Sequence, residues 1–226
     1  MAEAISEFFE QYGQVLLQGL LDTTVMVVVS TIFAYLLGLP LGVLLVITGK
    51  GGIRPNRWLN RILGWIINIG RSLPFIILMI AVQPFTRLIV GTSLGVPGAI
   101  PPLVLSAAPF IARMVETSLA EVDAGVVEAA QSMGASTWQI VRKVYLPEAK
   151  PSLILGASIS IITILAYTAI AGAIGSGGLG DLAIRYGHVR NVPAMLWTTV
   201  VMIIIIVQLI QSLFSRLSRK VDKRLR

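Results

Sequence analysis

Few side chains in this sequence could carry catalytic chemistry. It contains no cysteine and a single histidine, His188, so it cannot assemble a thiolate zinc site or a histidine proton relay. The phosphate-binding pattern G-x-x-x-x-G-K-[ST] is absent, because the only Gly-Lys pair, Gly49-Lys50, has Leu44 where the first glycine would stand. No apolar block holds a paired nucleophile and base. We therefore expect neither metal or redox chemistry nor nucleotide hydrolysis from this chain.

Residues 121–150 form the longest polar connection and are patterned as a docking element. Asp123 suits the N-cap of a short helix, because its carboxylate can accept a hydrogen bond from a free N–H group of the first turn. Gly134 suits the end of that helix, since a side chain would resist the left-handed turn expected there. One face of the helix would let another protein approach closely. That face is predicted to hold Val126, Ala130 and Met133, with Ala129 beside it.

A second short helix is predicted directly after the glycine bend. Ser136 and Gln139 have the spacing of a capping box, in which each side chain bonds the other residue's backbone N–H. Pro147 should stop this helix, because its ring clashes with the preceding turn and it has no N–H to donate. The pattern favours a helix, a bend and a helix that meet a partner protein over a helix that rests on lipid headgroups.

The composition shows which environment must position these residues. The chain is 55% hydrophobic and 13% charged, with a mean hydropathy of +0.84, whereas soluble domains are about 25% charged. Apolar blocks between islands of charge reach the roughly 20 residues that a membrane helix needs. Lipid offers no partner to backbone polar groups, and the blocks lack the alternation of a barrel. We predict one all-α polytopic membrane domain over residues 1–226, with five spans near residues 24–47, 62–82, 98–116, 152–174 and 194–215.

Lysine and arginine positions predict the orientation, because short cytoplasmic segments carry the excess of positive charge. One side of the predicted spans receives only Arg87, Arg185 and Arg190, and residues 1–18 are acidic. We therefore expect an N-terminus outside, an amphipathic stretch over residues 1–18, a cytoplasmic C-terminus and a cytoplasmic segment 121–150. The net charge of +7 indicates orientation and not nucleic-acid binding. The basic residues of the other side are Lys50, Arg54, Arg57, Arg61, Arg113, Arg142, Lys143, Lys150 and the run in 216–226.

Arg71 is a charge inside a predicted span, together with Ser72 and Pro74. An arginine at a helix centre costs about 2.5–3.5 kcal/mol on insertion scales, so it should face protein or water. Two interpretations stay open. Arg71 could lie beside a translocation path, or it could bond carbonyl groups that Pro74 frees in mid-helix.

The fourth predicted span carries a stripe of small and polar residues at helical spacing. Either a pore wall or a helix contact would use such a stripe, and packing is favoured because small and hydroxyl residues commonly join membrane helices. We expect close packing at Gly38-x-x-x-Gly42 and at Gly91-x-x-x-Gly95 for the same reason. The glycine-rich connection 175–193 could meet an external protein or simply be solvated. The stripe consists of Gly156, Ser160, Thr163 and Tyr167.

One string in segment 121–150 resembles the EAA loop of bacterial ABC importer permeases. It reads Glu128-Ala129-Ala130, three residues, Gly134, nine residues, Val144, one residue and Leu146-Pro147, with Val144 where the family pattern has isoleucine. In that family the loop is a coupling helix that sits in a cleft of a cytoplasmic ATPase. The resemblance implies an ATPase-coupling role for Glu128, Ala129, Ala130, Gly134, Leu146 and Pro147.

Further strings resemble the methionine importer permeases within that group. They are residues 71–75, 84–87 with 91–93, 108–113 and 177–180. The resemblance implies a type I ABC importer permease fold in the bacterial cytoplasmic membrane, and import of methionine, L- and D-forms both open, by alternating access. It also implies a homodimer with two ATPase subunits and an extracytoplasmic solute-binding protein, with ATP and magnesium on the ATPase and no cofactor on this chain.

Two alternatives stay open to different degrees. The first is an importer of the same kind for another amino acid, an osmoprotectant or a phosphonate. The second is an ion-driven secondary transporter, which would need carboxylates within the membrane. The predicted spans offer only Glu116, near a helix end, so this second alternative is remote.

Overall fold

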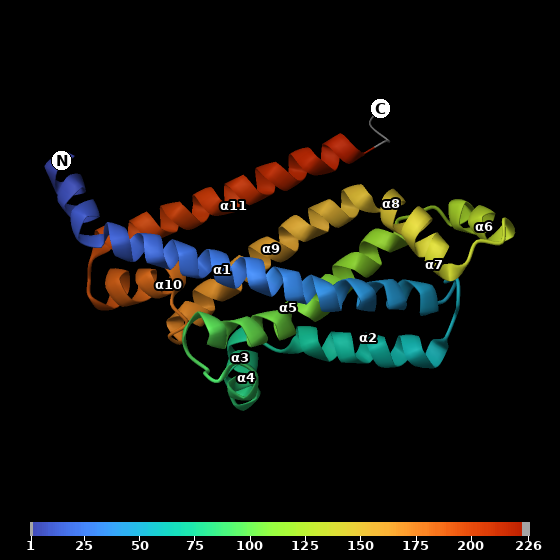
Figure 1. Ribbon diagram of the computed structural model, residues 1–226, viewed down its shortest axis with the longest axis horizontal. Coiled ribbons are helices and arrows are strands. Elements are labelled where there is room, and N and C mark those ends of the chain that lie inside the picture. Colours follow the sequence, from blue (N-terminus) through green and yellow to red (C-terminus); the bar gives the residue numbers. More distant parts are fainter. Residues whose placement is uncertain (1, 223–226) are drawn as a thin grey trace. The chain divides into compact units, whose positions relative to one another are not determined.

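The computed structural model describes the backbone of residues 2–222 and the side chains of residues 6–222 (Figure 1). Within this part of the chain every regular element is a helix, as predicted. Two of the helices, η1 and η2, are π-helices. The elements are α1 (Ala2–Thr48), α2 (Arg57–Ser72), α3 (Phe75–Ala81), α4 (Gln83–Val90), α5 (Gly95–Ala120), α6 (Ala124–Ser132), α7 (Thr137–Ile140), η1 (Val141–Tyr145), α8 (Leu146–Glu148), α9 (Lys150–Ala173), α10 (Gly178–Leu182), η2 (Ala183–Val189) and α11 (Pro193–Val221).

Four of these helices are long and apolar enough to cross a membrane: α1 from Ser6 onward, α5, α9 and α11. The bent pair α2 and α3 gives a fifth span if it is counted as one. The predicted number of spans therefore agrees with the helices. Their bounds extend beyond the predicted ones at both ends of α5 and toward the C-terminus of α11, which ends at Val221.

The helix predicted over residues 62–82 is not continuous. Helix α2 ends at Ser72, Leu73 and Pro74 are extended, and the chain turns by 100° before α3. The cause is Pro74, which has no N–H to continue the helix and forces the residue before it out of the helical region. Segment 62–82 is thus a helix, a break and a short helix.

The helix of the first span begins earlier than predicted. Residues 2–18, predicted as an amphipathic stretch outside the span, continue the same helix, so α1 runs without interruption from Ala2 to Thr48. Met1 lies outside the described residues. Neither Gly13 nor Gly19 breaks it. Its 47 residues give about 70 Å of helix, more than twice the thickness of the hydrocarbon core, so part of α1 must project beyond it.

The chain divides into two compact units, and α1, α5, α9 and α11 each contribute to both. The first unit comprises residues 1–31, 74–104 and 162–208, and the second comprises 32–73, 105–161 and 209–226. The core of the first unit contains Met26, Phe75 and Leu103, and a second cluster joins Leu16 to Met195. The core of the second unit packs Leu45 of α1 and Ile67 of α2 against Ala112 of α5.

Glycines bring α1 and α5 together in the second unit. A Cβ at Gly38 would lie 2.8 Å from the Ala108 carbonyl oxygen, and one at Gly42 would lie 2.6 Å from the Ala112 carbonyl oxygen. The expected close packing is confirmed there. It is wrong for Gly91 and Gly95, which have positive φ and border the turn between α4 and α5, so they serve backbone conformation instead.

Candidate functional site

The segment from α6 to α7 is built by local hydrogen bonds. The Asp123 carboxylate accepts a bond of 2.8 Å from the Gly125 N–H and caps α6, as predicted. Gly134 has φ +77°, and the Ala135 N–H donates to the Ala130 carbonyl at 3.1 Å, which closes the helix end. A side chain on Gly134 would meet no atom within 4 Å, so only backbone conformation demands glycine here. The predicted N-cap and left-handed bend are both confirmed.

Helix α7 begins with the predicted capping box. The Ser136 N–H donates to the Gln139 side chain at 2.8 Å, and the Gln139 N–H donates to the Ser136 hydroxyl at 3.3 Å. Pro147, however, does not stop the helical path, which continues through η1 and α8. The wider π turn of η1, where the Leu146 N–H bonds the Val141 carbonyl, carries the chain into α8, where proline in the first turn needs no donor.

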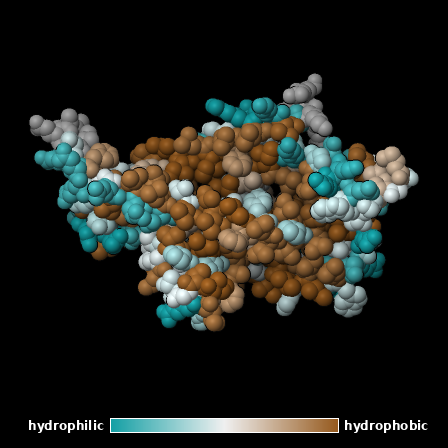
Figure 2. All heavy atoms as spheres, in the orientation of Figure 1, coloured by the Kyte–Doolittle hydropathy of each residue, from teal (hydrophilic) through white to brown (hydrophobic). Residues whose placement is uncertain are grey.

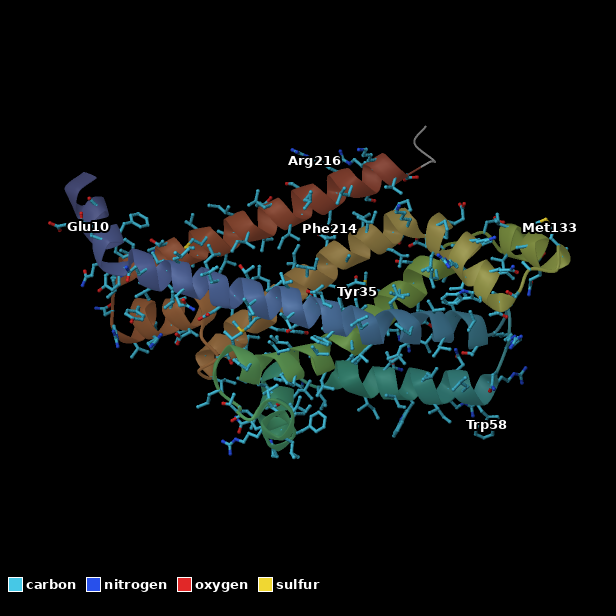
Figure 3. The ribbon with its side chains drawn as sticks, viewed as in Figure 1. Glu10, Tyr35, Trp58, Met133, Phe214 and Arg216 are labelled. Carbon is cyan, nitrogen blue, oxygen red and sulfur yellow. The ribbon has the colours of Figure 1, made fainter. Side chains whose placement is uncertain are left out.

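The face that α6 presents differs from the predicted one. Val127 and Ala130 are buried, whereas Val126 is 46% exposed and Met133 82% exposed. Figure 3 shows Met133 at the outer tip of the α6 bend. The face expected to hold Val126, Ala130 and Met133 is therefore split, because α6 turns Ala130 toward its own unit. Most of the motif is nevertheless open: Glu128, Ala129, Gly134 and Pro147 are exposed, and Leu146 is half-buried.

A cavity of about 470 Å³ lies behind α6 in the second unit. The ends of α1 and α5, the connection after α1 and Tyr145 of η1 complete its wall. Burial raises the pKa of the Tyr145 phenol. From α6, Ala124, Val127, Glu128 and Gln131 line the cavity.

Helix α2 carries Arg71, the arginine predicted within a span. Arg71, Ser72 and Pro74 are all exposed. The Ser72 hydroxyl donates to the Asn68 carbonyl at 2.7 Å. Within the described part of the chain the Arg71 guanidinium forms no hydrogen bond or ion pair, so it does not bond carbonyls freed by Pro74.

A polar network between α2 and α5 was not predicted. Arg113 forms an ion pair of 2.6 Å with Glu116 and donates to the Asn68 side-chain oxygen at 2.9 Å. Asn60 donates to the Leu45 carbonyl at 2.8 Å and thereby ties α2 to α1. The available signal was Asn68 within the predicted span 62–82 and Asn60 just before it. Their partners are distant in sequence, so the pattern alone did not identify them.

The stripe on α9 is divided between the two units. In the second unit Ser160 is buried, donates to the Gly156 carbonyl at 2.8 Å and hydrogen-bonds Tyr35, so it lies in a helix contact. In the first unit Tyr167 stacks on Phe75, with ring centroids 4.7 Å apart. Thr163 is half-buried there.

The connection after α9 is ordered by charge and aromatic contacts within the first unit. Asp181 and Arg185 form an ion pair of 2.6 Å, and the guanidinium groups of Arg185 and Arg190 lie 5.1 and 4.4 Å from the Tyr186 ring centroid. The Thr23 hydroxyl accepts a bond of 2.9 Å from the Leu179 N–H. Among the described residues no group of histidine and acidic side chains could hold a metal ion.

Apolar side chains dominate the surface of the long helices. Figure 2 shows hydrophobic residues over the helical shafts, and within the second unit hydrophilic residues gather around α6 to α8. Exposed large side chains of that unit include Leu36, Trp58, Trp65 and Leu213. Lipid or a partner subunit must cover such a surface.

Residues 34–226 match the family described as binding-protein-dependent transport system inner membrane component. The chain is 49% identical over 220 residues to a protein of Vibrio cholerae named "Probable D-methionine transport system permease protein MetI", covering 97% of this chain and 98% of that one. It is 47% identical over 181 residues to the "Methionine import system permease protein MetP" of Bacillus subtilis, covering 80% and 82%.

Solved structures are similar over most of the chain. A structure titled "Inward facing conformations of the MetNI methionine ABC transporter" aligns with TM-score 0.93 and 47% identity over 95% of this chain and 99% of that one. An amino acid ABC transporter solved with histidines aligns with TM-score 0.70 at 19% identity, which shows a shared fold alone.

Proposed function

Because the chain belongs to the family of inner-membrane components of binding-protein-dependent transport systems, we propose that it is the permease subunit of an ATP-driven methionine importer. It is a transport subunit of the bacterial inner membrane and not an enzyme. Its fold is that of an ABC importer permease.

The main support for methionine as the substrate is the similarity to methionine permeases over nearly the full length of the chain. The Vibrio cholerae relative shares about half its residues over almost the whole of both chains, so the similarity is not confined to the segment that all such permeases need. The structure aligned at TM-score 0.93 is that of a methionine transporter. Methionine is therefore favoured over another amino acid, an osmoprotectant or a phosphonate.

The partners follow from the same assignment. We infer that two copies of this chain assemble with two ATPase subunits, which hold ATP and magnesium, and that an extracytoplasmic binding protein delivers the solute. A second permease copy would cover part of the exposed apolar surface of the long helices. The basic residues near Lys50, Arg142 and Arg219 support an orientation with segment 121–150 in the cytoplasm and the N-terminus outside.

Segment 121–150 is proposed to couple ATP binding to movement of the helices. Its exposed tip around Met133 would sit on the ATPase, and the hydrogen bonds that fix the Gly134 bend would hold α6 and α7 at a set angle. Closure of the ATPase pair would pull this unit, and η1 and α8 would pass the movement on to α9. In thermodynamic terms ATP binds one arrangement of the complex more tightly and shifts the population toward it.

We assign different roles to the residues considered for the translocation path. Ser160 serves helix packing, because it is buried and bonded to its own helix and to Tyr35. Pro74 breaks the helix and starts α3. Arg71 and Ser72 are exposed on α2 and remain candidates for the path, as do Thr163 and Tyr167 in the first unit.

Uptake of labelled methionine into proteoliposomes tests this function. The vesicles contain this chain and its ATPase, with the binding protein and an excess of competing amino acids outside. We expect ATP-dependent accumulation that unlabelled methionine suppresses and unrelated amino acids do not. Accumulation without the ATPase, or equal competition by every amino acid, would contradict the proposal.

A further inference from the structure

Helix α2 presents three different faces around its axis. At 3.6 residues per turn the buried and the apolar sets occupy separate arcs. Arg61, Asn68 and Ser72 fall between them, and Arg71 falls about 60° around the axis from Asn68, beside Gly64 of the buried set. The first faces the interior of the second unit and is buried or half-buried: Asn60, Leu63, Gly64, Ile67 and Gly70. The second is exposed and apolar: Trp58, Ile62, Trp65, Ile66 and Ile69. The third is exposed and polar: Arg61, Asn68, Arg71 and Ser72.

The polar face cannot be turned toward lipid over its whole length. Charged and amide side chains within a membrane span face protein or water, because hydrocarbon offers them no partner. Arg61 lies near the start of α2, with its guanidinium 5.7 Å from the Trp58 ring centroid, so it can reach an interface. Arg71 lies about 21 Å beyond Arg57 along the helix axis, one residue before α2 ends.

Arg71 of α2 and Arg113 of α5 differ in charge compensation. Arg113 is neutralised by Glu116 and also bonds Asn68. Arg71 lies one helical turn beyond Asn68 on the same face, is exposed, and has no anionic partner among the described residues. The polar face of α2 therefore holds a cation, Arg71, whose charge no side chain among residues 6–222 compensates.

We propose that the polar face of α2 lines the aqueous path and that Arg71 binds the α-carboxylate of the transported amino acid. The inference rests on the proposed import function and names the side chain that recognises the substrate's charged end. A guanidinium can form two parallel N–H to oxygen bonds with a carboxylate, which favours it over other cations for this task.

The next residue can take part in the same contact. The Ser72 hydroxyl uses its hydrogen on the Asn68 carbonyl, so its lone pairs are available to accept a hydrogen bond. An α-ammonium group is a donor of the required kind. Arg71 and Ser72 together thus suit a zwitterionic amino acid.

Cysteine labelling tests where the polar face points. The natural chain has no cysteine, so each replacement gives a unique thiol on this subunit. Asn68→Cys and Ser72→Cys sample the polar face, and Ile66→Cys and Ile69→Cys sample the apolar face of the same turns. In the ATPase complex in proteoliposomes, a membrane-impermeant thiol reagent should label the polar pair at least tenfold faster. Equal rates on the two faces would overturn the aqueous path.

Charge rescue tests the role of Arg71. We expect Arg71→Cys to lower methionine uptake at least tenfold while ATPase stimulation by the loaded binding protein persists. Modification with an aminoethyl thiol reagent, which restores a cation, should recover part of the uptake, whereas a neutral reagent of similar size should not. Arg216→Cys, which replaces an exposed arginine of α11, is the matched control and should transport as the unmodified protein does (Figure 3).

The outcomes distinguish this inference from the proposed function. If the unaltered complex imports methionine and Arg71→Cys does so equally well, or if both reagents act alike, the carboxylate contact is overturned and the import function stands. If the unaltered complex imports no methionine, the import function itself fails. The labelling experiment still tests the aqueous path in that case, because labelling of the polar face no faster than of the apolar face would overturn it.

Discussion

Segment 121–150 and helix α2 both present open surfaces from the second unit, but they are stiffened in different ways. The segment is held by bonds between residues close in sequence, such as Ser136 with Gln139, and its exposed tip at Met133 is apolar. Helix α2 is held by contacts with distant residues, such as Asn60 with Leu45, and one of its two exposed faces is polar and charged. The first arrangement suits a lever and the second suits a path for a polar solute. Changes in one should therefore impair coupling, and changes in the other should impair solute passage.

The largest effect expected on the lever side follows from Gly134→Val. A β-branched residue resists a φ of +77°, although no atom would clash with its Cβ. We expect the protein to reach the membrane but to lose at least tenfold in methionine uptake and in ATPase stimulation by the binding protein. Gly134→Asn, which tolerates the left-handed region better, should retain most activity. Normal coupling in the valine variant would contradict the bend.

Met133→Asp should have the next largest effect, about tenfold on the same coupling measurement. A carboxylate at a desolvated contact carries a penalty, and Met133 is 82% exposed, so its replacement should leave the fold of its own unit intact. Ser132→Asp, at an exposed residue of the same helix that does not line the cavity, provides the matched control. Equal effects of the two changes would indicate a general charge effect and not a docking tip.

Asn68→Leu should reduce uptake only a few-fold. It removes the amide that accepts from Arg113 but leaves the Arg113 to Glu116 ion pair in place. ATPase stimulation should be unchanged, because the lever is intact. A loss of ATPase stimulation equal to the loss of uptake would contradict the separate roles of segment 121–150 in coupling and of helix α2 in solute passage.

Ser136→Ala should have the smallest effect. Loss of an N-cap costs about 1 kcal/mol, which here falls on a short helix. Hydrogen exchange in α7 should accelerate about fivefold, with uptake reduced less than twofold. Unchanged exchange at the Gln139 amide would argue that the capping box does not stabilise α7.

The two regions also differ in how far the sequence predicts them. Capping and bend residues at Asp123, Gly134 and Ser136 were identified correctly, because their partners lie within a few positions. The exposed face of α6 was assigned wrongly, since whether Ala130 or Met133 turns inward depends on the rest of the unit. The predicted helix stop at Pro147 was wrong as well. The wider π turn of η1 precedes it and lets the helical path continue although proline has no N–H to donate.

The number of spans could be predicted from hydropathy, but the shape of the second could not. Pro74 was noted as a defect within a span, yet the degree of the break depends on two extended residues. The contacts of Arg113 and Asn60 needed the tertiary structure, because their partners on other helices are distant in sequence.

Photo-crosslinking from position 133 tests the central claim most directly. The claim is that the α6 bend docks on a cytoplasmic ATPase and transmits its movement. A photoreactive side chain placed at Met133 in the assembled complex should form an adduct with the ATPase subunit, and its yield should change when ATP binds. Adducts with lipid or with the extracytoplasmic binding protein, and none with the ATPase, would contradict the account.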